Sequence, residues 1–314
     1  MKLVSIIIPC YNYGKYLPET ILSLQKQSLQ NWECVLVDNG STDNTKEVCA
    51  AICKADSRFN YYYCDNNGPA AARNIGIKNT LAKYIQLLDA DDLLEHDKLK
   101  MQVDYLEANT AVDLVYGEAR YFTNDNPSLR LYSMEEGNKD WMSKISSTDK
   151  LFKRQLLNGN IMPIHAALFR RELIEKNGLM DEQLKGYEDW DLFLRFAFNG
   201  AHFKFMRHEN AMALIRIHQS SLSKTSGHMN NYLFTVLQKT MCNTKMNFAN
   251  RMFVLIRYYQ QFFRIFFTKF RNSNITFINS DKVNSFKIFL LNIGAIIYSP
   301  FYLIIEGIKK VVRR

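Results

Sequence analysis

The sequence predicts an α/β protein in which a mixed, mostly parallel sheet is flanked by helices and followed by an amphipathic helical tail. Short apolar runs alternate with longer amphipathic segments over the first hundred residues, which is the pattern of successive βαβ units. Polar residues directly follow several of these apolar runs, at the sheet edge where α/β proteins bind ligands. A mixture of aromatic and basic residues near the C-terminus predicts the tail.

The expected elements follow the chain in order. Five apolar runs are the expected strands: 3–8, 33–37, 59–63, 84–88 and 113–117. Four segments with apolar residues at helical spacing, including Leu81 at the end of the third, are the expected helices: 16–29, 42–54, 69–81 and 97–109. Stretches 164–169 and 211–217 are expected to complete the mixed sheet, with a helix at 190–198 between them. The polar segment 122–150 is expected to be a long loop that closes over a site or binds an acceptor.

Length and composition exclude several classes of protein. A chain of 314 residues with 47% hydrophobic content can bury a core, so a disordered protein is excluded. The six cysteines form no C-x-x-C pair and no ligand spacing with histidine, so we expect reduced thiols without a zinc site or disulfide framework. The first apolar run ends at Pro9, too short for a secretory signal, so we expect a cytoplasmic catalytic part.

The net charge of +9 is concentrated in the tail. Residues 251–314 hold 11 of the 40 basic residues but only Asp281 and Glu306 of the 31 acidic ones. Basic and acidic residues are therefore equal in number in the first 250 residues. Binding of nucleic acid is therefore not expected.

The strongest local signal is three carboxylates, Asp89, Asp91 and Asp92, directly after an apolar run. Such crowding is unfavourable without a cation, and Mg²⁺ or Mn²⁺ takes oxygen ligands while leaving positions open for substrate phosphates. The alternative is that Asp91 or Asp92 caps a helix beginning near Leu93.

The segment from Gly68 to Gly76 consists mainly of small residues and contains Arg73. It predicts a helix start that a ligand can approach closely, with Arg73 as a cation for phosphate or a planar partner for a base. The alternative is a plain helix start with a solvated Arg73. No G-x-G-x-x-G follows the first strand, which disfavours a dinucleotide-binding dehydrogenase.

Five strings jointly resemble the family-2 glycosyltransferases, which have the Rossmann-like GT-A fold, and they occur in that family's order over about residues 1–225. They are Val4–Asn12, Val37–Asp43, Gly68–Asn74, Leu88–Asp92 and Gly186–Asp191. The resemblance implies an inverting transferase, of the hexosyl or N-acetylhexosaminyl type, that uses a nucleotide-sugar donor, with a UDP-sugar favoured.

The resemblance also implies which residues hold the donor nucleotide: Pro9, Tyr11, Asp38, Arg73 and Asp89. Of these, Asp89 corresponds to the carboxylate beside the ribose and phosphates. Asn12 and Asp43 lie in matching strings too, but turn and helix-cap roles are at least as consistent with them.

For the metal, the resemblance implies Asp91 as a ligand of Mn²⁺ or Mg²⁺. His218 corresponds to a late histidine of the family that completes the metal shell or touches the diphosphate, and the nearby Arg216 suits an anionic leaving group. The other histidines considered, His165, His202 and His208, are expected to be structural.

The catalytic base is expected in the pair Glu188 and Asp189, with Asp189 preferred and a helix N-cap as its alternative role. Asp189 would take the proton of an acceptor hydroxyl in a single displacement. A glycosidase is disfavoured because its two opposed carboxyl groups would leave the nucleotide motifs unused. An inactive nucleotide-binding scaffold and a metal-dependent nucleotidyltransferase remain as alternatives.

We expect a catalytic domain at 1–225, with a nucleotide-binding half at 1–120 and an acceptor-binding half at 121–225, and a helical region at 226–314. Within 251–314, a stripe of Arg257, Arg264 and Arg271 and an apolar run at 288–305 predict attachment to a membrane surface. We therefore expect a peripheral enzyme on the cytoplasmic face of the inner membrane, acting on a glycan or lipid-linked acceptor. The alternative is that the tail helices pack on the catalytic domain or on a second subunit of a homo-oligomer.

Overall fold

The computed structural model describes residues 2–65, 67–133, 138–218 and 226–272, with side chains described except at 226–231 and 264–272. The chain forms two compact units, 1–259 and 260–314. The apolar run at 288–305 and the side chains of Arg264 and Arg271 lie outside the described residues, so these parts of the tail prediction stay predictions. The division at residue 225 also stays a prediction.

The central layer of the first unit is a seven-stranded sheet in the order β3-β2-β1-β4-β8-β6-β9. Its strands, in chain order, are β1 (Val4–Cys10), β2 (Trp32–Asn39), β3 (Phe59–Cys64), β4 (Tyr84–Leu87), β6 (Leu114–Tyr116), β8 (Ala167–Arg170) and β9 (Phe203–Phe205). Strands β1 to β4 pair in parallel, β8 is antiparallel to both of its neighbours, and β9 is parallel to β6. The predicted mixed, mostly parallel sheet is confirmed.

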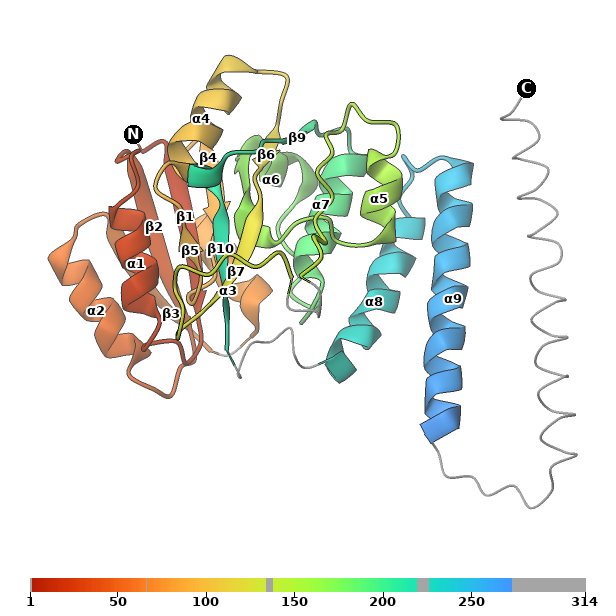
Figure 1. Ribbon diagram of the computed structural model, residues 1–314, viewed down its shortest axis with the longest axis horizontal. Coiled ribbons are helices and arrows are strands. Elements are labelled where there is room, and N and C mark those ends of the chain that lie inside the picture. Colours follow the sequence, from red (N-terminus) through yellow and green to blue (C-terminus); the bar gives the residue numbers. More distant parts are fainter. Residues whose placement is uncertain (1, 66, 134–137, 219–225, 273–314) are drawn as a thin grey trace, which may run out of the picture. The chain divides into compact units, whose positions relative to one another are not determined.

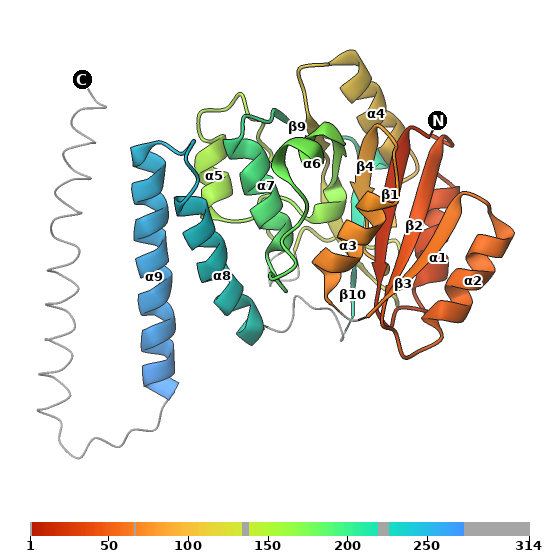
Figure 2. The same cartoon turned by 180° about the vertical axis from the view of Figure 1, so that it is seen from behind.

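Helices cover both faces of this sheet, with α1 and α3 on opposite faces (Figures 1 and 2). In chain order the helices are α1 (Leu17–Gln25), α2 (Thr45–Ala55), α3 (Pro69–Lys78), α4 (Lys98–Ala108), α5 (Phe152–Asn158), α6 (Glu172–Asn177), α7 (Glu188–Phe198), α8 (Ser226–Met241) and α9 (Phe248–Asn272). Two 3₁₀ turns, η1 (Ile164–Ala166) and η2 (Glu209–Ala211), complete the order. Because helices lie on both faces, the inner parallel strands are nearly continuous buried runs, as in the fully buried Ile6, Ile7 and Ile8 of β1, whereas the edge strand β3 is partly exposed.

The small residues of α3 serve packing. Ala72 is fully buried in a cluster with Val35 and Val37 of β2. A Cβ at Gly76 would lie 2.4 Å from Cγ2 of Ile7, so only glycine lets the helix approach β1 this closely. The expectation that these residues leave room for a ligand is therefore wrong at Ala72 and Gly76, where the sheet fills the space.

A second sheet corrects two sequence expectations. Strands β5 (Leu93–Leu94), β10 (Ala213–Ile217) and β7 (Ala119–Thr123) form a separate three-stranded sheet in the order β5-β10-β7. Segment 211–217 thus does not complete the main sheet, where β9 occupies the edge position. Residues 93–94 are a strand and α4 begins only at Lys98, so neither Asp91 nor Asp92 caps a helix beginning near Leu93.

The end of one helix differs from its expected range, whereas the long loop after β7 follows the prediction. Helix α3 ends at Lys78, which leaves Leu81 outside it with 76% of its surface exposed. Between β7 and α5, the described residues form a loop without a helix or strand, as predicted. The hydroxyl of Tyr116 anchors this loop by donating to the carbonyl oxygens of Ser143 and Ile145, at 2.6 and 2.5 Å.

Within the first unit, helix α9 contacts α5 and α7 through Arg257. This side chain donates to Oδ1 of Asn158 at 2.5 Å and lies 5.8 Å from the ring centroid of Trp190 on α7. Arg257 is therefore turned toward the protein and does not belong to a stripe that faces lipid headgroups. Among the described helices, none combines the length and apolar character needed to cross a membrane.

Candidate functional site

The carboxyl ends of β1 and β2 bring Tyr11 and Asp38 to one edge of the sheet, because Cys10 is in register with Asp38. Tyr11 follows β1 and is 45% exposed, so its ring is open to a ligand. Asp38 is only 1% exposed. Its two oxygens accept from the backbone N–H of Ser41 at 2.9 Å and from the hydroxyl of Tyr61 at 3.0 Å. Asp38 therefore holds the turn after β2, and Pro9 lies half-buried within β1.

Asn12 and Asp43 are turn residues in this structure. Asn12 has a left-handed backbone, with φ of 57°, and its side-chain oxygen accepts from the N–H of Thr42 at 2.7 Å. Asp43 accepts from the N–H groups of Gly14 and Thr45, at 3.1 and 3.0 Å. Both side chains thus fix the loops that surround Tyr11.

Arg73 on α3 is buried between two carboxylates. Its guanidinium donates to Oδ1 of Asp89 at 2.6 Å and to Oε1 of Glu188 at 2.8 Å, and the residue is 4% exposed. Burial by itself raises the pKa of Asp89, but Arg73 outweighs that effect and lowers it below the ordinary value. Arg73 thus connects the loop after β4 that carries Asp89, Asp91 and Asp92, hereafter the acidic loop, with the start of α7. It is neither solvated nor open to a ligand.

The second sheet brings the predicted metal residues together, because His218 follows β10. Nε2 of His218 lies 2.7 Å from Oδ2 of Asp91. Burial raises the pKa of Asp91, and the nearby charge of Asp89 adds to this effect. One carboxylate and one imidazole therefore meet at a position where negative charge is unfavourable, which suits a cation.

Arg216, which sequence reasoning assigned to an anionic leaving group, is engaged within the fold. It is 3% exposed, and its N–H donates to Oδ1 of Asp92 at 2.8 Å. Its guanidinium donates to the carbonyl oxygen of Asp91, to Asn124 and to Glu19. Arg216 therefore holds the acidic loop in place and has no group directed at a leaving group.

The first turn of α7 carries the candidate base. Tyr187, the N-cap residue, has a left-handed backbone with φ of 59°, an uncommon conformation for a residue other than glycine. Glu188 is 9% exposed and paired with Arg73, whereas Asp189 is half-buried. Oδ2 of Asp189 accepts from Nδ2 of Asn160 at 2.6 Å, and Oδ1 accepts from the N–H of Trp190 at 2.7 Å. Asp189 therefore lies inside the helix and is not its N-cap.

The Asp189 carboxyl group has a strongly shifted pKa. Burial and then the negative charge of Glu188 raise the pKa of Asp189 to about 7, against the opposing effect of Arg73. At neutral pH this group can therefore both accept and release a proton.

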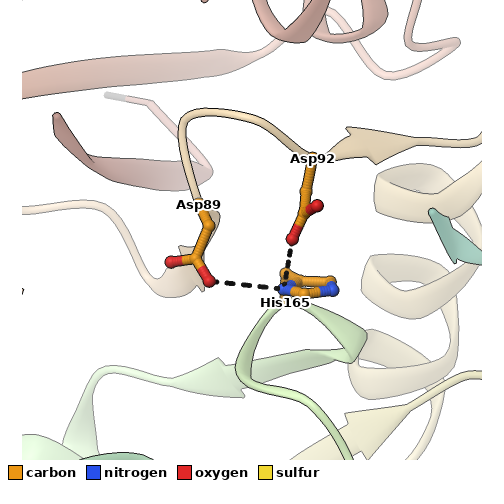
Figure 3. Close-up of side chains that lie close together, drawn as sticks. All are labelled: Asp89, Asp92 and His165. Carbon is orange, nitrogen blue, oxygen red and sulfur yellow. Dashed lines mark ion pairs between the residues drawn. The ribbon is translucent and has the colours of Figure 1, made fainter. Parts of the chain in front are cut away.

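His165, expected to be structural, lies beside two of the three carboxylates of the acidic loop (Figure 3). Its Nδ1 is 3.3 Å from Oδ2 of Asp92 and 3.9 Å from Oδ2 of Asp89. These three residues are also the group that the described part of the chain offers for a metal ion. Burial lowers the pKa of His165 to about 4, so its ring is neutral at pH 7. Sequence reasoning missed it because only the antiparallel pairing of β8 with β4 brings it to this loop.

Known proteins are similar to this chain in sequence or in fold. An uncharacterized glycosyltransferase of Haemophilus influenzae is 35% identical over 195 residues, covering 62% of this chain and 71% of that protein. One of Rickettsia conorii is 46% identical over 134 residues, covering 43% of this chain and 22% of that protein, so this chain spans only about a fifth of that relative's length. The crystal structure of Staphylococcus aureus TarS 1–349 in complex with UDP-GlcNAc has a TM-score of 0.64 at 18% identity, covering 84% of this chain and 73% of that one.

The structural match confirms the predicted GT-A fold. The family model described as Glycosyl transferase family 2 matches residues 5–178, more than half of the chain. That range includes the turn after β2, Arg73 and the whole acidic loop. The chain therefore belongs to glycosyl transferase family 2.

Proposed function

We propose that this protein transfers a sugar, with inversion, from a UDP-sugar to a hydroxyl group of a glycan or lipid-linked acceptor. The observation that carries the proposal is the Asp189 carboxyl group, which is half-buried, oriented by Asn160, and has a pKa of about 7. A general base works best when its pKa lies near the working pH, because it is then ionised and still basic enough to accept a proton.

Asp189 would take the proton from the acceptor hydroxyl while that oxygen attacks the anomeric carbon of the donor. The bond from the anomeric carbon to the diphosphate breaks in the same step, so the configuration inverts and the nucleoside diphosphate leaves with the bonding electrons. The hydrogen bond from Asn160 fixes one oxygen of Asp189, which orients the carboxylate. Glu188 is occupied by Arg73, which favours Asp189 over Glu188 as the base.

On the donor side, the exposed ring of Tyr11 is available to the nucleotide base, and Asp38 supports the turn beside it. Asp91 and His218 would hold Mn²⁺ or Mg²⁺ in place of the 2.7 Å hydrogen bond that joins them in this structure. The bound ion would supply Lewis-acid stabilisation for the leaving diphosphate. Arg73 and Asp89 would contribute by shaping the loop that lies between donor and base.

Attachment of the tail to the cytoplasmic face of the inner membrane remains part of the proposal. The support is the excess of basic residues over acidic ones in 251–314 together with the exposed aromatic side chains of Tyr259 and Phe262 on α9. Such attachment would bring the enzyme close to a lipid-linked acceptor.

Binding of UDP, GDP and dTDP, measured by thermal shift with and without Mn²⁺, tests the donor assignment. We expect UDP to stabilise the native chain in a Mn²⁺-dependent manner, and Asp91→Ala to lose that dependence. A chain that no nucleotide stabilises would contradict the proposal. Release of pyrophosphate in place of UDP during turnover would instead indicate a nucleotidyltransferase.

A further inference from the structure

His165 presents an unsatisfied polar group inside the protein. The residue is 3% exposed, and neither of its ring nitrogens makes a hydrogen bond. A buried polar atom without a partner is destabilising, so a native structure keeps one only where something else compensates. The nitrogen that faces the acidic loop, Nδ1, points at carboxylate oxygens (Figure 3).

The carboxylates of Asp89 and Asp92 each use one oxygen elsewhere and turn the other toward His165. Oδ1 of Asp89 accepts from Arg73 at 2.6 Å, and Oδ1 of Asp92 accepts from the N–H of Arg216 at 2.8 Å. Each Oδ2 faces Nδ1 of His165, at 3.9 and 3.3 Å. An ion that binds nitrogen and oxygen at about 2.0–2.2 Å holds its ligand atoms about 3–4 Å apart, so both separations suit a shared ion.

Two buried glutamine side chains fix the backbone around His165 by hydrogen bonds. Nε2 of Gln86 donates to the carbonyl oxygen of His165, and Nε2 of Gln102 donates to that of Ala166, both at 3.0 Å. The amine of Lys98, fully buried, donates to both glutamines at 2.6 and 2.9 Å. These bonds fix the backbone that carries the imidazole, and Arg73 and the Arg216 N–H fix the two carboxylates, so the three ligand atoms are preorganised.

We propose that Asp89, Asp92 and His165 bind a divalent first-row transition ion such as Mn²⁺ or Zn²⁺, at a site separate from Asp91 and His218. One imidazole nitrogen with two carboxylate oxygens suits these ions better than Mg²⁺, which prefers oxygen ligands alone. The ion would fasten the loop after β4 to the turn before β8 and so connect the donor side of the site to the acceptor side. It requires no nucleotide, so the site does not depend on the proposed transfer reaction.

The test uses the full chain and Mn²⁺ alone, without nucleotide. We expect Mn²⁺ to raise the Tm of the native chain by about 5 °C when it is in large excess over its Kd. Because Asp91 and His218 would also bind Mn²⁺, the comparison is made in the His218→Gln chain. This variant is expected to keep a rise, and adding His165→Gln to it is expected to abolish that rise. A His218→Gln chain that Mn²⁺ and Zn²⁺ leave unchanged, or a rise that persists in the double variant, would overturn the proposal.

A second measurement covers the case in which His165→Gln does not fold. Pulsed electron paramagnetic resonance of Mn²⁺ bound to the His218→Gln chain is expected to detect coupling to an imidazole nitrogen, and bound Mn²⁺ without such coupling would overturn the site. Binding of UDP to the native chain in the presence of Mn²⁺ separates the two proposals. No Mn²⁺-induced rise in the His218→Gln chain, with UDP binding to the native chain intact, contradicts only this inference, whereas a rise in the His218→Gln chain without UDP binding to the native chain contradicts only the proposed function.

Discussion

Two adjacent acidic residues at the start of α7 have different surroundings. Glu188 is buried against Arg73, whereas Asp189 is half-buried and accepts from Asn160. The sequence pattern predicts the pair but cannot assign the partner of each member, because Arg73 is 115 positions from Glu188 along the chain. The same limit applies to His165, whose position depends on the pairing of β8 with β4.

The pH dependence of kcat/KM reports the ionisation of Asp189. Its pKa of about 7 means that the group is protonated below pH 7 and ionised above it, so kcat/KM should rise with pH and level off above pH 7. Glu188→Gln removes the neighbouring negative charge and should move the rising limb to lower pH. A rise of kcat/KM near pH 4 in the native enzyme, or the same midpoint in the native enzyme and Glu188→Gln, would disagree with this explanation.

Replacement of Arg73 tests its role between two carboxylates. Arg73→Met leaves Asp89 and Glu188 without their shared cation, so the free energy of unfolding should fall by about 3 kcal/mol, as for other broken buried pairs. Lys83→Met is the control, because its pair with Glu107 is more than 40% exposed at both side chains and should contribute below about 1 kcal/mol. Urea unfolding of the three chains measures both differences, and equal losses would argue against the buried bridge.

At the scale of secondary-structure elements, the parallel half of the sheet follows from the sequence because its strands are continuous apolar runs between amphipathic helices. The second sheet does not follow, because β7 and β10 are short and far apart in the chain. Their parallel pairing is set by tertiary contacts, including the bond from the Arg216 guanidinium to Asn124, directly after β7. The antiparallel pairing of β10 with β5, which directly follows Asp91 and Asp92, is nevertheless what brings His218, predicted from its motif, to Asp91.

Close packing of α3 on β1 predicts the effect of one added methyl group. Gly76→Ala would place a Cβ 2.4 Å from Cγ2 of Ile7, so the helix must shift and the free energy of unfolding should fall by about 1–3 kcal/mol. Gly159→Ala is the control, because nothing lies within 4 Å of its added Cβ and its backbone is extended. Chemical denaturation compares them, and an unchanged stability in Gly76→Ala would show that the interface can relax.

At the scale of the whole molecule, charge is distributed unevenly. Basic and acidic residues are equal in number before residue 251, whereas basic residues are in excess after it. Composition predicts this division, but the inward position of Arg257 could not be predicted because amphipathicity does not identify what a helix face contacts. The membrane proposal therefore depends on the remaining basic and aromatic residues of 251–314.

Vesicle binding tests the tail. The full chain should bind phosphatidylglycerol vesicles more tightly than phosphatidylcholine vesicles, since each basic residue near an anionic surface contributes about 1 kcal/mol. Binding should weaken as salt rises from about 0.05 to 0.5 M, because salt screens surface charge. Cosedimentation measures both effects, and equal binding to the two lipids at low salt would exclude an electrostatic attachment.

The most direct test of the proposed chemistry is transfer from a UDP-sugar by Asp189→Asn, with UDP affinity measured on the same sample. The amide keeps the shape of the side chain but cannot accept the proton, so kcat should fall about 10²–10⁴-fold while UDP binds as before. Asp104→Asn, the same change at an exposed position on α4, should keep native activity. Native-like transfer by Asp189→Asn would contradict the assignment of Asp189 as the base.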